Sequence, residues 1–187
     1  FLWHHPFLRT TAFVYGLGNF TIPGVLFVVV VAGKEQGLSG GTIGLLSALF
    51  GACTLLGAVA SPLFRRTLST RTIMLNELWL GLGSLAFVAW PNVYVLALAI
   101  LPQAVCLPVT DSVVIGYRLA ITPDRLLGRV ESVRRTIALA AAPLGPLVAG
   151  FLLGATSARE TIAVFAAVTL ALALWGTLSR AIKEAPS

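Results

Sequence analysis

Residues 122–135, TPDRLLGRVESVRR, are followed directly by residues 136–153, TIALAAAPLGPLVAGFLL, which carry no charged side chain. The first segment is cationic, and cationic side chains are costly to place in lipid. The second segment, at ~1.5 Å per residue, is long enough to cross most of a ~30 Å hydrocarbon core. Together the two segments predict a charged loop followed by a membrane helix.

Small residues recur at every fourth position of this helix and predict a face with almost no side chain. They are Ala138, Ala142, Pro146, Gly150 and Gly154. Helices in a bilayer approach each other closely through such faces, because lipid supplies no hydrophobic drive for their association. The residues that we expect to pack against a neighbouring helix are Gly145, Pro146, Gly150 and Gly154.

The composition of the chain is typical of an integral membrane protein. Hydrophobic residues make up 57% of the 187 residues and charged residues 11%, and the mean hydropathy is +0.92, values far from those of soluble domains. Six apolar segments leave only short connections between them. We therefore predict an all-α fold, a single six-helix transmembrane bundle over residues 1–187. The predicted spans are 12–32, 42–64, 72–90, 93–117, 136–153 and 161–178.

The cationic residues gather at one end of the predicted bundle. Six spans place both termini on the same side, where eleven of the thirteen Lys and Arg residues lie. They are Arg9, Arg65, Arg66, Arg71, Arg118, Arg125, Arg129, Arg134, Arg135, Arg180 and Lys183. Positive loops stay in the cytoplasm, so we predict a multi-pass protein of the cell membrane, inner or plasma, with both termini cytoplasmic. This placement accounts for the basic balance without nucleic acid, which we do not expect as a partner.

The first and fourth predicted spans share two features, internal proline and polar side chains. Pro23 interrupts the first span, and Pro102 and Pro108 interrupt the fourth. Paired, broken, polar helices at the same place in two three-helix units predict an inverted-repeat transporter, because polar groups are tolerated where they line a water-filled path. The competing interpretation is that prolines are simply commoner in membrane helices. The residues that we assign to a substrate or proton pathway are Asn19, Thr21, Gln103, Thr110 and Asp111.

Two carboxylates, Glu77 and Asp111, lie inside the predicted spans. A charged residue at the centre of a bilayer costs at least ~2.5 kcal/mol on insertion scales, so such residues face the bundle and have a partner or a role. Both lie towards the cytoplasmic ends of their spans, which favours salt bridges with the arginines there. For Asp111, which lies deeper, two interpretations stay open: contact with substrate or protons, or a pair with Arg118 two helical turns away.

Residues 122–135 and the following run 142–152, APLGPLVAGFL, resemble the major facilitator superfamily. They are similar to the region of the tenth and eleventh helices in exporters of that superfamily. The closest group contains the enterobactin and macrolide exporters, in which P-x-x-L-x-G-R-V-x-S and A-P-L-G-x-L-x-G-G recur. Residues 1–9 resemble the entry into the seventh helix of that group. The resemblance implies the carboxyl-terminal half of such a transporter, six helices arranged as two inverted three-helix repeats.

Residues 57–66, GAVASPLFRR, resemble the superfamily loop motif G-x-x-x-D-R-x-G-R-R but depart from it. Ser61 replaces its aspartate and Pro62 its first arginine. The helix-capping acid of this loop is therefore missing, and a gate on this side would rest on Glu77 and Glu131. Glu131 precedes Arg134 and Arg135 at helical spacing. The residues that we assign to a cytoplasmic gating network are Arg65, Arg66, Glu77, Arg118, Asp124, Arg129, Glu131, Arg134 and Arg135.

The resemblance implies a secondary active transporter of the efflux type, and residues 145–150 also resemble the antiporter motif G-P-x-x-G-G. Because the chain has no P-loop and no hydrolase or metal motif, we expect neither an enzyme nor a bound cofactor or metal. We predict a proton-coupled exporter of small amphipathic or apolar compounds. It would act in the lipid bilayer with a second six-helix half, either a missing amino-terminal half or a second copy. The alternative is a non-transporting membrane scaffold, or a degenerate half-transporter that binds a partner bundle.

Overall fold

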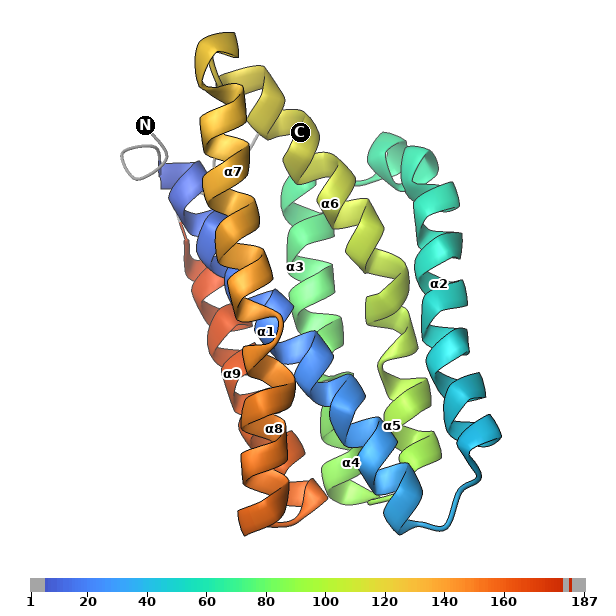
Figure 1. Cartoon of the computed structure of the whole chain (residues 1–187). Helices are drawn as coiled ribbons and strands as arrows, with labels where there is room; N and C mark the ends of the chain where they lie inside the picture. Colours follow the sequence, from blue (N-terminus) through green and yellow to red (C-terminus); the bar gives the residue numbers. More distant parts are fainter. Residues whose placement is uncertain (1–5, 180–181, 183–187) are drawn as a thin grey trace.

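The computed structural model describes residues 6–179 and 182, and every regular element in them is a helix. The elements are α1 (Pro6–Glu35), α2 (Gly40–Thr67), α3 (Thr70–Leu80), the 3₁₀ helix η1 (Gly81–Leu85), α4 (Ala86–Ala89), α5 (Val93–Ala99), α6 (Leu101–Ile121), α7 (Asp124–Ala141), α8 (Leu144–Ala155) and α9 (Ala158–Leu178). They form one upright bundle (Figure 1). Arg180 and Lys183, assigned above to the basic end, and residues 1–5 of the entry segment lie outside the described residues.

Six helical segments are long and apolar enough to cross a membrane, which confirms the predicted fold class of an all-α, multi-pass membrane protein. They are Phe7–Glu35, Gly40–Thr67, Thr70–Ala89, Val93–Ile121, Asp124–Ala155 and Ala158–Leu178. Most of them extend beyond the spans read from hydropathy. The reason is that the polar residues flanking an apolar run remain helical. Ser39 caps the start of α2 by accepting a hydrogen bond from the backbone N–H of Thr42, and Ser69 caps α3 in the same way through Thr72.

The segment predicted as a charged loop is mostly helical, and this prediction was wrong. α6 continues to Ile121 and α7 begins at Asp124, so the break between them is short. Pro123 disfavours helix at Thr122, and Asp124 then sits favourably in the first turn of α7, at the positive end of its dipole. Charge keeps this segment out of lipid, but it does not prevent a helix. The fifth span therefore comprises α7 and α8.

Proline interrupts only one of the two spans in which we expected a break. α1 runs unbroken through Pro23, whereas the fourth span breaks at Ile100, just before Pro102. The third span, where no proline lies, changes to 3₁₀ geometry at Gly81. A proline removes one hydrogen bond and crowds the preceding turn, and the long α1 absorbs this loss without ending.

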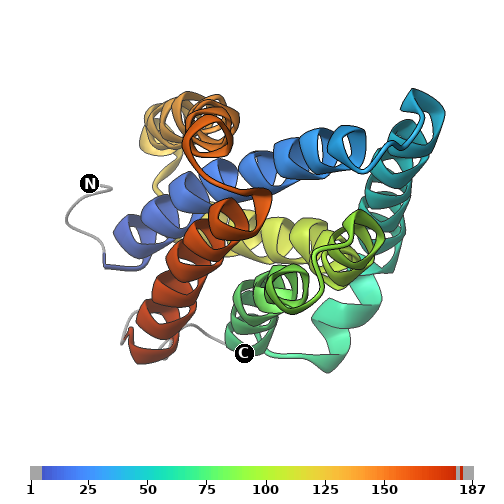
Figure 2. The ribbon, with the colours of Figure 1, turned by 90° about the horizontal axis from the view of Figure 1, so that it is seen from below.

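The helices fall into two three-span units, a first unit of residues 6–89 and a second unit of residues 93–178. In the first unit, α2 and α3 pack mainly on α6; in the second, α8 and α9 pack on α1. Figure 2, seen along the bundle, shows α2 beside α6 and α8 beside α1. Exchanging the two units reproduces these main contacts, which is the pattern of two related three-helix repeats.

Each of these crossings depends on one glycine. A Cβ on Gly57 of α2 would collide with the carbonyl oxygen of Val105 in α6, and a Cβ on Gly145 of α8 would collide with the carbonyl oxygen of Phe20 in α1. Small residues allow two backbones to approach this closely in a membrane. The two crossings are thus equivalent contacts in the two units.

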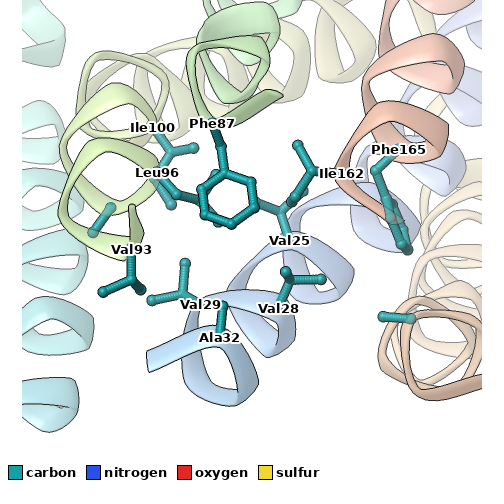
Figure 3. Close-up of a cluster of buried hydrophobic side chains, with 12 residues drawn as sticks. Val25, Val28, Val29, Ala32, Phe87, Val93, Leu96, Ile100, Ile162 and Phe165 are labelled. Atoms are coloured by element: carbon teal, nitrogen blue, oxygen red, sulfur yellow. The ribbon is translucent and has the colours of Figure 1, made fainter. Parts of the chain in front are cut away.

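A buried apolar cluster holds the bundle together at the end away from the start of α1 and the end of α9 (Figure 1). Phe87 of α4 lies at its centre, surrounded by Val25, Leu96, Ile100 and Ile162 (Figure 3). Phe165 extends the cluster towards α8 and stacks on Phe20, with ring centroids 5.3 Å apart. Because α1, α4, α5 and α9 all contribute, this end of the bundle joins the two units.

α9 has two different faces. Its threonines point inward: Thr161 and Thr169 are buried, and their hydroxyls donate to the carbonyls of Ser157 and Phe165. Large apolar side chains such as Leu174 and Leu178 are exposed on the other face. The polar groups are satisfied within the helix, which leaves an apolar surface outward.

Candidate functional site

A cavity of about 280 Å³ lies between α1, α2, α3, α6 and α9. Its polar lining residues are Asn19, Thr21, Thr54, Glu77, Gln103, Thr110, Asp111 and Thr169. The structure thus brings all five residues of the predicted pathway, which come from two distant helices, to one cavity. This cavity is the candidate functional site.

Proline shapes the cavity from both units. Pro23 of α1 and Pro108 of α6 both line it. Neither residue has an N–H group, so neither can donate to the carbonyl four residues earlier, at Asn19 and Ala104. Pro23 lies three residues after Phe20, and Pro108 lies three residues after Val105, the residues at the two glycine crossings. The same local backbone therefore occurs twice at the cavity.

Gln103 reaches the cavity because η1 begins with a glycine. A Cβ on Gly81 would lie 2.8 Å from the Gln103 Nε2 atom and 3.0 Å from Cγ2 of Thr169. A side chain at position 81 would displace one of these two neighbours. The glycine at the start of η1 in the third span therefore makes room for a polar cavity residue of the fourth.

Glu77 lies in a different place from the one that we predicted. It lines the cavity from α3, on the same helix face as Met74 and Leu78, and shares this lining with Thr110 and Asp111 of α6. In the described residues it makes no ion pair with an arginine. Distance along the sequence placed Glu77 near the membrane edge, but the face of α3 that carries it is the one packed on α6.

Two cavity residues, Thr54 and Thr169, were not predicted as part of the site. Thr54 lies in α2, seven residues before Ser61 and therefore on the same helix face. This polar spacing in an apolar helix was a usable signal. Thr169 lies in the sixth span, and its contribution to the cavity depends on how α9 packs.

Glu131 joins two helices at the end of the bundle where α1 starts. Its carboxylate accepts from Arg118 of α6 at 2.6 Å and from Arg134 of α7 at 2.8 Å. The Arg118 side chain is 8% exposed, whereas that of Glu131 is 40% exposed. This ion-pair cluster (Arg118, Glu131 and Arg134) fixes the angle between α6 and α7 on either side of Pro123.

The other residues of the predicted gating network do not join this cluster. Five of them are exposed and form no ion pair within residues 6–179 and 182. They are Arg65, Arg66, Asp124, Arg129 and Arg135. On α2 a neutral contact takes the place of the missing motif aspartate: the Ser61 and Ser112 hydroxyls lie 2.7 Å apart. α2 is therefore tied to α6 by a hydrogen bond and not by charge.

The small-residue stripe of the fifth span is divided between two faces. Gly145 packs on α1, as described above, and Pro146 is half-buried. Gly150 and Gly154 are exposed, and a Cβ on Gly154 would have no neighbour within 4 Å in the described part of the chain. These two glycines lie with Pro146, Leu147 and Phe151 along a shallow apolar groove.

The described residues contain no group of three or more His, Cys, Asp or Glu side chains that could hold a metal ion. Comparison with curated proteins gives no match. A family model of the Major Facilitator Superfamily matches residues 9–187, nearly the whole chain. The six spans, the two exchangeable units and this match lead to one conclusion: the chain belongs to the major facilitator superfamily, whose members are membrane transporters.

Proposed function

We propose that the chain is one half of a proton-coupled exporter of small amphipathic or apolar compounds. The cavity is the observation that carries this proposal. It gathers the polar residues of α1 and α6 inside a bundle that is otherwise apolar, and polar side chains within membrane spans mark pathways for substrates and ions. Export is supported by the resemblance of residues 122–135 and 142–152 to the enterobactin and macrolide exporter group.

The substrate class follows from the rest of the lining. Apolar side chains such as Ile22, Leu78, Leu107 and Leu172 make up much of the cavity wall. Ligand sites of this kind bind through apolar area and use a few polar groups to orient the ligand. A small compound with both apolar and polar parts fits this lining.

A second six-helix half completes the transporter. α2 and the fifth span are the least buried of the six spans. Leu55, Leu56 and Val59 of α2 and Phe151 of α8 are between 63% and 75% exposed. These side chains, together with the groove at Gly150, offer an apolar face to a partner bundle. The partner is either an amino-terminal half or a second copy of this chain.

Proton coupling rests on Asp111 and Glu77. Removal from water disfavours the charged form of a carboxylic acid, so an acid in a membrane cavity can exchange a proton as the cavity opens and closes. If protons are coupled in this half, Asp111 is the best local candidate, and Glu77 lines the same cavity. No cofactor takes part in this proposal, and the proton gradient supplies the energy.

In this proposal the bundle spans the cell membrane. By the positive-inside rule, its basic end lies on the cytoplasmic side. Here the ion-pair cluster serves as the gate, since pairs that break and re-form can bias a conformational equilibrium by ~1 to 3 kcal/mol. Glu131→Ala should alter transport and leave membrane insertion intact, because Glu131 joins α6 to α7. Arg129→Ala, at an exposed residue outside the cluster, should have a smaller effect.

Transport by the protein and its second half, reconstituted in vesicles, tests the proposal. A set of anionic, neutral and cationic lipophilic dyes should include one that moves when a proton gradient is imposed, and a protonophore should stop this movement. Asp111→Asn should lower gradient-driven transport at least tenfold, whereas Glu35→Gln, at an exposed acid outside the cavity, should not change it. Unchanged coupling in Asp111→Asn would assign coupling to Glu77 or to the second half.

The alternative function is a non-transporting scaffold or degenerate half-transporter. Ser61 in place of the motif aspartate favours it, because a gate contact of the superfamily motif is then absent. If none of the dyes moves with the second half present, while the two halves remain bound to each other, the scaffold is the better description.

A further inference from the structure

A small recess adjoins the cavity on the side of the apolar cluster. It has room for about 10 Å³, and it shares Thr21, Gln103 and Thr169 with the lining of the cavity. Its lining also includes Val25 and Ile100, which belong to the apolar cluster (Figure 3). A space of this size holds about one water molecule. We call this side chamber, with its polar residues Thr21, Ser84, Gln103 and Thr169, the η1 recess.

Two irregular points of the spans meet at the η1 recess. The third span changes to 3₁₀ geometry at Gly81 and the fourth span breaks at Ile100, and both residues line the recess. Gly83 allows the two points to pack closely, because a Cβ on it would collide with the carbonyl oxygen of Ala99. Irregular backbone at membrane depth is tolerated where it is buried in protein or lines a polar space. The recess therefore follows from the backbone of two spans.

Three hydroxyl groups line the η1 recess, and each uses its proton within its own helix. Thr21, Ser84 and Thr169 each donate to a backbone carbonyl three or four residues earlier. A hydroxyl that has donated its proton offers its lone pairs to a further group. Three hydrogen-bond acceptors, from α1, η1 and α9, thus border a space for one small group.

The fourth polar residue of the η1 recess is Gln103, whose amide can both donate and accept. The described lining carries no charged side chain, so an ammonium group would lose its hydration there without a carboxylate to offset the cost. A neutral group that donates to a hydroxyl oxygen and accepts from the amide matches the lining better. A hydroxyl group does both, as does water.

We propose that the η1 recess is a subsite of the transport cavity that binds one hydroxyl group of the ligand, and that water fills it when no ligand is bound. This proposal deepens the proposed transport function and rests on it. The ligand class narrows to apolar compounds that carry a projecting alcohol group. The alcohol donates to a hydroxyl oxygen of the recess and accepts from Gln103, and the apolar body lies against the aliphatic wall of the cavity.

Two compounds with the same carbon skeleton test this preference. They are methyl naphthyl ketone, which accepts hydrogen bonds but cannot donate them, and the secondary alcohol that its reduction gives. Binding is measured by equilibrium dialysis to the detergent-solubilised protein with its second half, with protein-free micelles to subtract partitioning. The alcohol should bind about fivefold more tightly than the ketone, the gain from one net hydrogen bond. Equal affinities, or no saturable binding of the alcohol, would overturn the proposal.

Ser84 locates the subsite, because it is 2% exposed and lines the recess but not the cavity. Ser84→Val fills the recess with an apolar side chain and should make the two affinities equal. Ser84→Ala removes one acceptor and leaves the space, so it should reduce the preference to about twofold; it serves as the test if Ser84→Val does not fold. A preference that survives these substitutions in folded protein would place the contact elsewhere and overturn the proposal.

Ser47→Ala is the matched control for these variants. The Ser47 hydroxyl also donates to a carbonyl of its own helix, but Ser47 lies outside both the cavity and the recess. The preference for the alcohol should therefore stay at about fivefold, as in the unaltered protein.

A map by cryo-electron microscopy that resolves water separates a ligand subsite from a permanent water site. The proposal expects density for one water in the η1 recess of the unliganded protein, and density for the ligand oxygen in its place in the alcohol complex. A water that keeps its place when the alcohol is bound would overturn the proposal.

The subsite and the transport function fail in different ways. If vesicles move the alcohol and the ketone under a proton gradient but the protein binds them equally, the subsite is wrong and the transport function stands. If the alcohol is preferred as predicted but no compound moves, the subsite stands and the exporter function is wrong.

Discussion

The two three-span units have similar backbone contacts but different side chains at the cavity. In each unit a glycine of the second span, Gly57 or Gly145, packs on a carbonyl of the other unit's first span. In each, a cavity-lining proline follows that carbonyl by three residues. The side chains at the cavity are not repeated, because α1 contributes neutral groups and the fourth span contributes Asp111. The backbone contacts of the fold are thus repeated in the two units, whereas the side chains at the cavity are not.

The connections between the first and second spans differ in the same way. In the first unit, Gln36 donates to the carbonyl of Pro91 at 3.1 Å and accepts from the backbone N–H of Val93 at 3.0 Å. In the second unit, the connection is held by Arg118 and Glu131. A neutral amide serves at one end of the bundle, and ion pairs serve at the other.

The largest expected effect on stability comes from disrupting the glycine crossings that the two units share. Gly57→Ala and Gly145→Ala each put a methyl group onto a carbonyl oxygen and should lower the free energy of unfolding by about 3 kcal/mol, the upper range for overpacking. Thermal unfolding in detergent measures this. Gly51→Ala and Gly154→Ala, whose added Cβ atoms meet nothing within 4 Å in the described residues, are the controls and should be neutral or stabilising by up to ~1 kcal/mol. Similar losses at all four glycines would contradict the equivalence of the crossings.

The ion-pair cluster should give the next largest effect. Within the described part of the chain, only the second unit has such a cluster. Glu131→Gln removes the charged partner of Arg118, whose side chain is mostly buried, and should cost about 1.5 kcal/mol, between the values for exposed and buried pairs. Asp124→Asn, at an exposed acid on the same helix, should cost little. A double-mutant cycle between positions 118 and 131 measures the coupling, and a coupling of zero would remove the cluster from the comparison.

The neutral connection should matter less. Gln36→Ala breaks two partly exposed hydrogen bonds and should lower stability by about 1 kcal/mol, with no dependence on salt concentration. The loss in Glu131→Gln, by contrast, should shrink in high salt, because screening already weakens the exposed side of that pair. Chemical denaturation at two salt concentrations measures both variants. A salt-dependent effect of Gln36→Ala would show that the two connections do not differ as described.

The smallest effect is expected at Ser61. It follows Gly57 by four residues, as the fully buried Ala149 follows Gly145, so Ser61→Ala makes the first crossing resemble the second. Loss of the Ser61–Ser112 hydrogen bond should cost about 0.6 kcal/mol, a typical value between membrane helices. Ser47→Ala, at an exposed serine that bonds within its own helix, is the control. A loss of several kcal/mol at Ser61 would mean that the two crossings are held together differently.

Much of the fold could be predicted from the sequence, because the length of each apolar run shows whether it can cross a bilayer. Each apolar run is long enough to span a bilayer, and the short connections leave one arrangement of six helices. The ends of the helices could not be predicted in this way. Residues 124–135 are charged but helical, since charge controls where a segment lies in the membrane and proline and capping control whether it is a helix.

Part of the site could be predicted as well. Asn19, Thr21, Gln103, Thr110 and Asp111 were selected because polar groups in apolar helices need a common polar surface, and they do line one cavity. The position of Glu77 could not be predicted, because a residue near the end of a span can face either a neighbouring helix or the membrane edge. Which of these applies depends on how α3 turns against α6, and this is a property of packing.

The exchanged packing of the two units has a consequence for biosynthesis. Of the described helices, α1 is synthesised before the others, but its glycine crossing is with α8, and the partner of α2 is α6. Contacts between residues so far apart along the chain form late, because a long loop must close first. We therefore expect the first unit to stay inserted but incompletely packed until the fifth span follows it into the membrane, an interval in which insertion factors can hold it.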